Sequence, residues 1–274
     1  MINLKTNKMK KFIFLLITLL VITFNQKSEA QVISSQEEQA KRDTVKAHLK
    51  KAQLLTKQGN TEEASKIFIS LMESEPDNRD AVQGWLMANM KRTPTGEEEA
   101  VKSLEELSKL YPKNTGIIFF KAFIESEYGH NEEALKDIDK LINIQPDTAL
   151  NYILKGQVLY AMEKYEEAFK AYDKATSLNP NRPDVWGMKA GALSEMGKFD
   201  DAIIAANKGL ELAPNNPTGI YNRACIYSLK GDKANALADL KKAISMNPSF
   251  KEYARKDEDF KSLYDDEEFK KLTL

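Results

Sequence analysis

The residue types that most often carry out chemistry are scarce in this 274-residue chain. His48 and His130 are its only histidines, and Cys225 is its only cysteine. A zinc site or a Cys–His pair would therefore need carboxylates that no motif singles out. The sequence also lacks a glycine-rich phosphate loop. We expect no enzyme activity, no catalytic residue, no bound metal and no cofactor. Both histidines should have solvent-facing structural roles, and Cys225 should be a half-buried apolar side chain.

An acidic run near the C-terminus is the one further candidate for a cation site. It comprises Asp265, Asp266, Glu267 and Glu268. Acidic residues also favour the first turn of a helix, where they complement the partial positive charge of the helix end. A solvated helix start is the simpler interpretation of this run, so we expect function to depend on a surface.

The elements that would build such a surface recur with a fixed period. Alanines are spaced by 34 residues, at Ala100, Ala134, Ala168, Ala202 and Ala236. Prolines follow each of them by twelve residues, at Pro112, Pro146, Pro180, Pro214 and Pro248. One earlier pair, Ala64 and Pro76, fits at a spacing of 36. The period defines six units, over residues 45–78, 81–114, 115–148, 149–182, 183–216 and 217–250.

Each unit has the pattern of two helices of about fourteen residues joined by a turn. In the fifth unit, Trp186, Ala190 and Leu193 share a helical face, and Gly197 breaks the chain. Small residues allow two antiparallel helices to approach closely, and a proline such as Pro214 prevents the second helix from continuing. This pattern resembles the tetratricopeptide repeat (TPR). The second unit departs most from it, with residues 92–96 as its turn. Its register is open, because its two extra residues could lie before the first helix or in that turn.

The resemblance implies an all-α fold, an α-α superhelix, here a right-handed solenoid of six helical hairpins. Residues 251–274 do not begin a seventh repeat and should form a capping helix that covers the last hairpin. Residues 31–44 are polar and are expected to be either a flexible lead-in or an added helical turn. A single cysteine excludes an intramolecular disulfide, so stability must come from packing.

The first thirty residues have the layout of a secretory signal peptide. Lysines precede an apolar run over residues 12–24, and small residues at Ser28 and Ala30 fit a cleavage site after Ala30. A permanent anchor is the alternative, but a thirteen-residue helix spans only ~20 Å of a ~30 Å hydrocarbon layer. We therefore expect export to a periplasm or to the outside, with no stable membrane insertion after cleavage.

Cleavage at this site would also change the net charge of the chain. The first thirty residues hold five Lys and one Glu, so their removal changes the net charge from −1 to −1 − 4 = −5. A negative chain gives no electrostatic reason to bind nucleic acid.

Stacked helical hairpins present an extended concave face, lined mainly by the first helix of each unit. Positions three, seven and ten after the second residue of a unit return to one side of its first helix. We expect the partner-binding groove to be lined by Phe119, Phe123, Ile153, Gln157, Tyr160 and Tyr221. The same spacing adds Gly116, Ser126, Leu150, Asp184, Gly187, Gly191, Ser194, Thr218, Cys225 and Ser228. For Phe119 and Phe123 a place in the hydrophobic core is an equal alternative, because residues 117–120 are apolar on all sides.

Relatives that grip C-terminal carboxylates use Lys and Asn on neighbouring first helices. The matching positions here hold Leu49 and Gln53, then Trp85 and Asn89, then Phe119 and Phe123, so we expect no such clamp. The sequence thus predicts an exported, non-catalytic adaptor that binds a protein or peptide partner in its groove. The alternative is a structural subunit of an envelope assembly, docking through its convex face or its ends.

Overall fold

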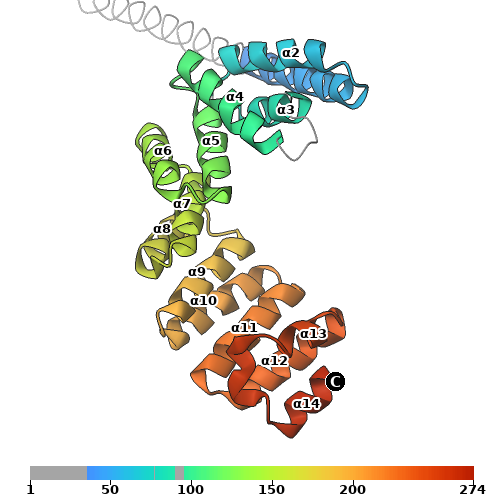
Figure 1. The fold of residues 1–274 in the computed structure, drawn as a ribbon, viewed down its shortest axis with the longest axis vertical. Coiled ribbons are helices and arrows are strands. Elements are labelled where there is room, and N and C mark those ends of the chain that lie inside the picture. Colours follow the sequence, from blue (N-terminus) through green and yellow to red (C-terminus); the bar gives the residue numbers. More distant parts are fainter. Residues whose placement is uncertain (1–35, 77, 90–95) are drawn as a thin grey trace, which may run out of the picture. The chain divides into compact units, whose positions relative to one another are not determined.

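The computed structural model describes residues 36–76, 78–89 and 96–274 (Figure 1). These residues fold into helices joined by short turns, and they include no strand. They form two compact units, which divide between Thr93 and Pro94. The predicted all-α fold class and the array of consecutive helical hairpins are confirmed.

Some predicted features lie outside the described residues. These are the signal peptide over residues 1–30, the cleavage site after Ala30 and most of the turn around Pro94. Within the described ranges no helix combines the length and the apolar character that crossing a bilayer requires.

The first unit contains a helix over residues 36–57, then α2 (Thr61–Ser74) and α3 (Arg79–Asn89). Residues 36–44, for which the sequence allowed a flexible lead-in or an added turn, are therefore helical. Helices α2 and α3 pack against each other, with Phe68 fully buried between them. A Cβ atom at Gly84 of α3 would lie only 2.3 Å from the Phe68 ring, so this contact requires glycine.

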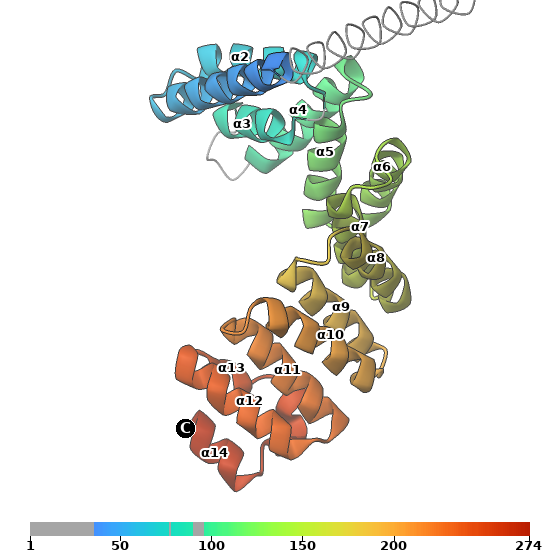
Figure 2. The ribbon, with the colours of Figure 1, turned by 180° about the vertical axis from the view of Figure 1, so that it is seen from behind.

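The second unit begins with α4 and continues through four regular hairpins and a C-terminal segment. Its helices are α4 (Gly96–Leu110), α5 (Thr115–Glu127), α6 (Asn131–Ile144), α7 (Ala149–Ala161), α8 (Tyr165–Leu178), α9 (Pro183–Glu195), α10 (Phe199–Leu212), α11 (Pro217–Lys230) and α12 (Lys233–Met246). Each pair from α5–α6 to α11–α12 packs as a hairpin and contacts the next pair. Opposite views show α9 to α12 side by side (Figures 1 and 2). The predicted second hairpin, 81–114, is divided, because α3 belongs to the first unit and α4 to the second.

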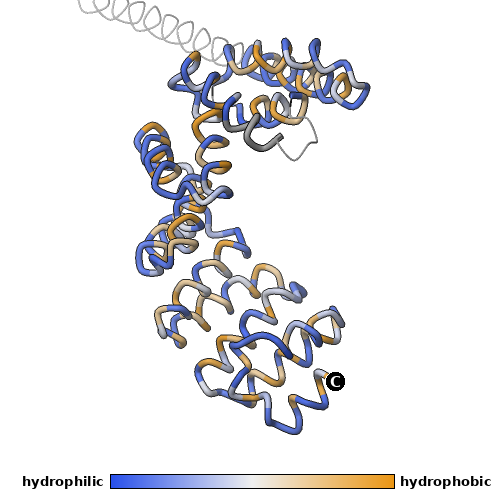
Figure 3. The backbone as a smooth tube through the Cα atoms, in the orientation of Figure 1, coloured by the Kyte–Doolittle hydropathy of each residue, from blue (hydrophilic) through white to orange (hydrophobic). Residues whose placement is uncertain are grey.

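The recurring small residues lie where the helices cross. Ala134, Ala168, Ala202 and Ala236 are all 0% exposed. Gly156 of α7 lies under the Tyr172 ring, where an added Cβ would be only 2.4 Å from the ring. Hydrophobic and hydrophilic residues alternate along these helices, which fits one buried face on each (Figure 3). The 34-residue spacing therefore marks the contacts that hold each hairpin together.

A basic side chain also recurs every 34 residues on the first helices, a feature that the sequence analysis did not use. The pairs are Lys121–Asp137 at 2.6 Å, Lys155–Asp139 at 2.8 Å, Lys189–Asp173 at 2.6 Å and Arg223–Asp239 at 2.7 Å. Lys155 and Lys189 bind the second helix of the preceding hairpin, whereas Lys121 and Arg223 bind within their own hairpin. These ion pairs thus connect helices both within hairpins and between them.

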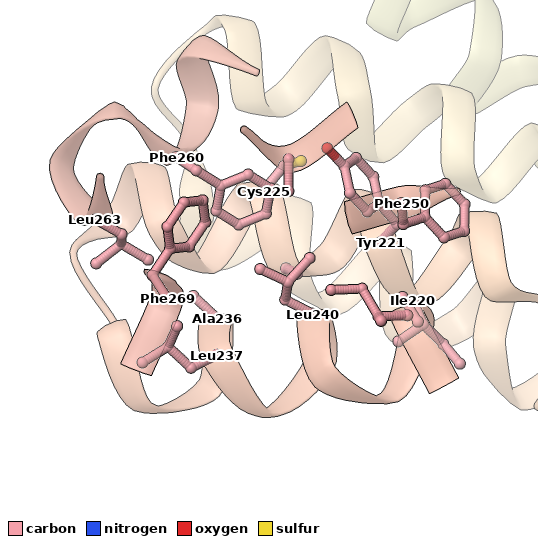
Figure 4. Packing of buried hydrophobic residues seen from close by; sticks show 14 residues of the cluster. Ile220, Tyr221, Cys225, Ala236, Leu237, Leu240, Phe250, Phe260, Leu263 and Phe269 are labelled. Carbon is pink, nitrogen blue, oxygen red and sulfur yellow. The ribbon is translucent and has the colours of Figure 1, made fainter. Parts of the chain in front are cut away.

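The C-terminal segment caps the last hairpin with three short helices instead of the single predicted helix. They are α13 (Phe250–Ala254), the 3-10 helix η1 (Glu258–Leu263) and α14 (Glu267–Thr273). Phe250, Phe260 and Phe269 pack into one core with residues of α11 and α12 (Figure 4). The acidic run supplies the start of α14, because the Asp266 carboxylate accepts hydrogen bonds from the backbone N–H groups of Glu268 and Phe269.

Candidate protein-binding groove

The residues predicted to line the groove lie on α5, α7 and α11, but the structure buries three of the six. Phe119 is 9% exposed, Ile153 4% and Tyr221 7%. Phe119 packs with Phe120 in an edge-to-face contact, and Ile153 packs in the core with Tyr172. The side chains of Phe119 and Ile153 thus belong to the core and not to an open groove surface. Helical spacing selects a face of a helix, but it does not show what covers that face.

Phe123 and Gln157 do lie at the surface, and they line one small hollow. Phe123 is 40% exposed, and Gln157 on the next first helix is also exposed. The hollow has a volume of about 140 Å³, and its wall includes Leu154 and Val158. Of the two places that the sequence left open for Phe123, the structure therefore shows the surface and not the core.

A larger hollow of about 260 Å³ opens where α7, α9, α10, α11 and the C-terminal segment meet. Six residues that the helical spacing placed on the groove face line it, namely Tyr160, Gly187, Gly191, Ser194, Tyr221 and Cys225. A Cβ atom at Gly187 would meet nothing within 4 Å, and one at Gly191 would come no closer than 3.9 Å to Tyr160. The absence of side chains at these two glycines leaves space for a ligand.

Two tyrosines that line this hollow each donate a hydrogen bond to a carboxylate. The Tyr160 hydroxyl donates to Glu195 Oε1 at 3.0 Å. The Tyr221 hydroxyl donates to Asp257 Oδ2 at 2.7 Å, and the Cys225 thiol lies 3.6 Å from the same oxygen. In Figure 4 the Tyr221 hydroxyl and the Cys225 sulfur point to the same side of α11. Both tyrosines thus have fixed orientations.

Asp257 and Asp259 bring negative charge into the hollow from outside the repeats. Asp257 caps η1, and its Oδ1 accepts a hydrogen bond from the backbone N–H of Asp259. The repeat spacing does not identify these two residues or Glu195 as site residues. The tail has no repeat period, so no spacing could place it against α11. Asp257 before Asp259 is a helix-start signal, but it does not show which surface that helix covers.

Burial and mutual repulsion shift the pKa values of several of these groups. Burial, with the nearby charge of Asp257, raises the pKa of the Asp259 carboxyl above its usual range. Burial, followed by the charge of Asp257, also raises the pKa of the Cys225 thiol, which keeps it protonated at neutral pH. Burial, with the hydrogen bond to Asp257, raises the pKa of Tyr221. Burial and the nearby carboxylates thus all favour the protonated forms of these three groups.

Cys225, Asp257 and Asp259 could also be considered as metal ligands, since their ligand atoms all lie within 4.8 Å of one another. The Asp257 carboxylate already accepts hydrogen bonds from Tyr221 and from the backbone of Asp259, and the thiol is protonated. A bound ion would have to displace these contacts and ionise the thiol. The trio therefore fits a metal poorly.

Consecutive helical hairpins with a ligand-sized hollow on their first helices define the class of helical-repeat proteins that bind partners on a surface. The model of the FAT domain matches residues 28–255, and the chain belongs to this family. No curated protein shows a significant match to the chain.

Several solved structures share the fold. The C-terminal part of a TPR repeat-containing protein from Cytophaga hutchinsonii has a TM-score of 0.57 and 16% identity, covering 82% of this chain and 92% of its own. MamA from Desulfovibrio magneticus RS-1 has a TM-score of 0.54 and 17% identity, covering 68% and 96%. YrrB, described as a TPR protein with an unusual peptide-binding site, has a TM-score of 0.53 and 19% identity, covering 69% and 97%. At these identities the likeness shows the fold alone, which is that of TPR proteins.

Proposed function

We propose that this protein is an exported, non-catalytic scaffold or adaptor that binds a peptide segment or a helix of a partner protein on the first helices of its second unit. The observation that carries the proposal is the hollow of about 260 Å³, which is lined by six residues that the helical spacing placed on the groove face. Repeat proteins of this kind use such surfaces to hold other chains. YrrB, a fold neighbour, is described as having a peptide-binding site, which supports a peptide or protein partner.

Exposed apolar residues on the second helices favour a different role. Leu110, Ile144, Leu212 and Met246 occupy equivalent places near the ends of α4, α6, α10 and α12, and they are 70%, 48%, 40% and 39% exposed. Leu178, at the same place on α8, is half-buried. A row of apolar side chains on this face would suit a structural subunit that docks in a larger assembly and leaves the groove empty. The two roles differ in which face the partner covers.

Replacing Phe123 with alanine tests the groove. Phe123 lies at the surface, so its loss should change stability by less than about 1 kcal/mol, while loss of an aromatic anchor costs more than about 1 kcal/mol of binding. We expect the variant to retain less of the protein that the wild type captures from its native envelope extract, with an unchanged thermal midpoint. Ile144→Ala is the matched control for the second-helix face. If Phe123→Ala captures the partner normally and Ile144→Ala captures less of it, the partner binds the second-helix face and not the groove.

Export has its own test. If the signal peptide is cleaved after Ala30, the mature chain begins at Gln31 and is recovered from the extracytoplasmic fraction. Intact-mass measurement of that fraction should show a chain of residues 31–274. Recovery of a chain that still begins at Met1 would contradict this proposal.

A further inference from the structure

The hollow of about 260 Å³ contains an excess of negative charge. Glu195, Asp257 and Asp259 line it, and no lysine or arginine is among the described residues of its wall. None of the three carboxylates forms an ion pair within the described part of the chain. Elsewhere in the second unit, carboxylates such as Asp137 and Asp239 contact a basic side chain within 3 Å. The three acids of the hollow therefore differ from Asp137 and Asp239 in having no basic side chain beside them.

Two tyrosines and two glycines also line the hollow and affect its shape. Tyr160 is half-buried at the wall, whereas the Tyr221 ring is 7% exposed and stacks on Phe250 at 4.5 Å. Gly187 and Gly191 have no side chain that would fill the hollow. Aromatic faces and carboxylates both attract lysine and arginine cations. Of the carboxylates here, Asp257 and Asp259 are half-buried and Glu195 is exposed. The charge, the Tyr160 ring and the size of the hollow all favour the same kind of ligand.

We propose that this hollow binds a lysine or arginine side chain of the partner, which lies against the Tyr160 ring and is neutralised by Glu195 and Asp259. This inference rests on the proposed function, because it names the chemistry of the segment that the groove holds. Asp257 keeps its place as the hydrogen-bond acceptor of Tyr221 and the cap of η1, so it acts as a positioning residue. An arriving cation would also relieve the repulsion that raises the pKa of Asp259.

Peptide libraries test the inference while the partner itself is still unidentified. The probes are a degenerate nonapeptide library with a fixed central arginine and an identical library with citrulline, which has nearly the same shape but no charge. We expect the full-length protein, immobilised, to retain at least about fivefold more of the arginine library. In Glu195→Gln/Asp259→Asn the two libraries should be retained equally. Its thermal midpoint should change little, because each amide keeps the size of the carboxyl group, an amide oxygen at position 195 can still accept the hydrogen bond from Tyr160, and neither acid forms an ion pair in the described part of the chain.

The matched control changes the net charge by the same amount elsewhere. Glu167 on α8 and Asp201 on α10 are exposed acids that do not line the hollow. Glu167→Gln/Asp201→Asn should keep the preference for arginine. Equal retention of both libraries by the wild type would overturn the inference, and so would loss of the preference in this control. Stabilisation by Zn²⁺ or Ca²⁺ alone that Asp259→Asn abolishes would instead assign the hollow to a metal ion and would also overturn it.

The failure of this inference differs from the failure of the proposed function. Partner capture that depends on Phe123 but not on Glu195 and Asp259 would support binding in the groove. It would overturn the inference that the hollow binds a lysine or arginine side chain. Partner capture that depends on none of these residues would overturn both.

Discussion

Replacing Lys121 with methionine lowers the free energy of unfolding of the second unit by about 3 to 5 kcal/mol. Lys121 lies between two buried carboxylates, with its ammonium 2.8 Å from Glu125 Oε1 and 2.6 Å from Asp137 Oδ2. Burial tends to raise the pKa of Asp137, but hydrogen bonds from Lys121 and Lys140 hold it below its usual range, so this carboxylate is charged at neutral pH. Methionine fills the space of the lysine stem but leaves that buried charge with only the exposed Lys140.

Lys155→Met is the matched control, because Lys155 occupies the same place one repeat later. Its partner Asp139 has a side chain that is 58% exposed, so loss of this pair should cost less than about 1 kcal/mol. Urea unfolding followed by the fluorescence of Trp186, in a Trp85→Phe background, reports on the second unit separately from the first. Equal losses from Lys121→Met and Lys155→Met would show that burial of the carboxylates does not govern the strength of these pairs.

The sequence was sufficient to predict the repeated hairpins. Ala134, Ala168, Ala202 and Ala236 are fully buried because two helices cross at each of them, and a crossing leaves a period in the sequence. The recurring cations at Lys121, Lys155, Lys189 and Arg223 were equally visible in the sequence. Their partners were not, because a cation on a first helix can bind an acid sixteen residues before it or sixteen residues after it.

The candidate site was only partly predictable from the sequence. Helical spacing correctly gathered Tyr160, Gly191 and Tyr221 around one hollow. It could not show that Phe119 is covered by its neighbours, since burial depends on which helices pack against that face. The carboxylate of Asp257 lies 36 positions after Tyr221, in a tail without a repeat, so only the fold brings the two together. Periodicity predicts what repeats, and the acidic side of the hollow does not repeat.

Phe260 is the most deeply buried aromatic residue of the tail that supplies this acidic side, so Phe260→Ala should have the second large effect on stability. Phe260 is 0% exposed, and its ring centroid lies 5.7 Å from that of Tyr221 and 5.7 Å from that of Phe269. Loss of a buried phenylalanine costs about 3 to 5 kcal/mol. We expect a loss of that size in urea unfolding of the second unit, whereas Tyr253→Ala, at a residue that is 62% exposed, should cost less than about 1 kcal/mol.

The segments in which Phe260→Ala loses amide-exchange protection show whether the tail unfolds together with the helices that line the hollow. Tyr221 contacts both Phe260 and Asp257, so the 3-10 helix cannot leave α11 without also removing the acceptor of the Tyr221 hydroxyl. If the tail unfolds together with the hairpins, Phe260→Ala lowers the amide-exchange protection of α11 and α12 along with that of residues 250–273. If protection falls in residues 250–273 alone, the tail is an independent cover on the last hairpin. In that case the Trp186 transition would remain at the wild-type urea concentration, and the expected loss in the second unit would be wrong.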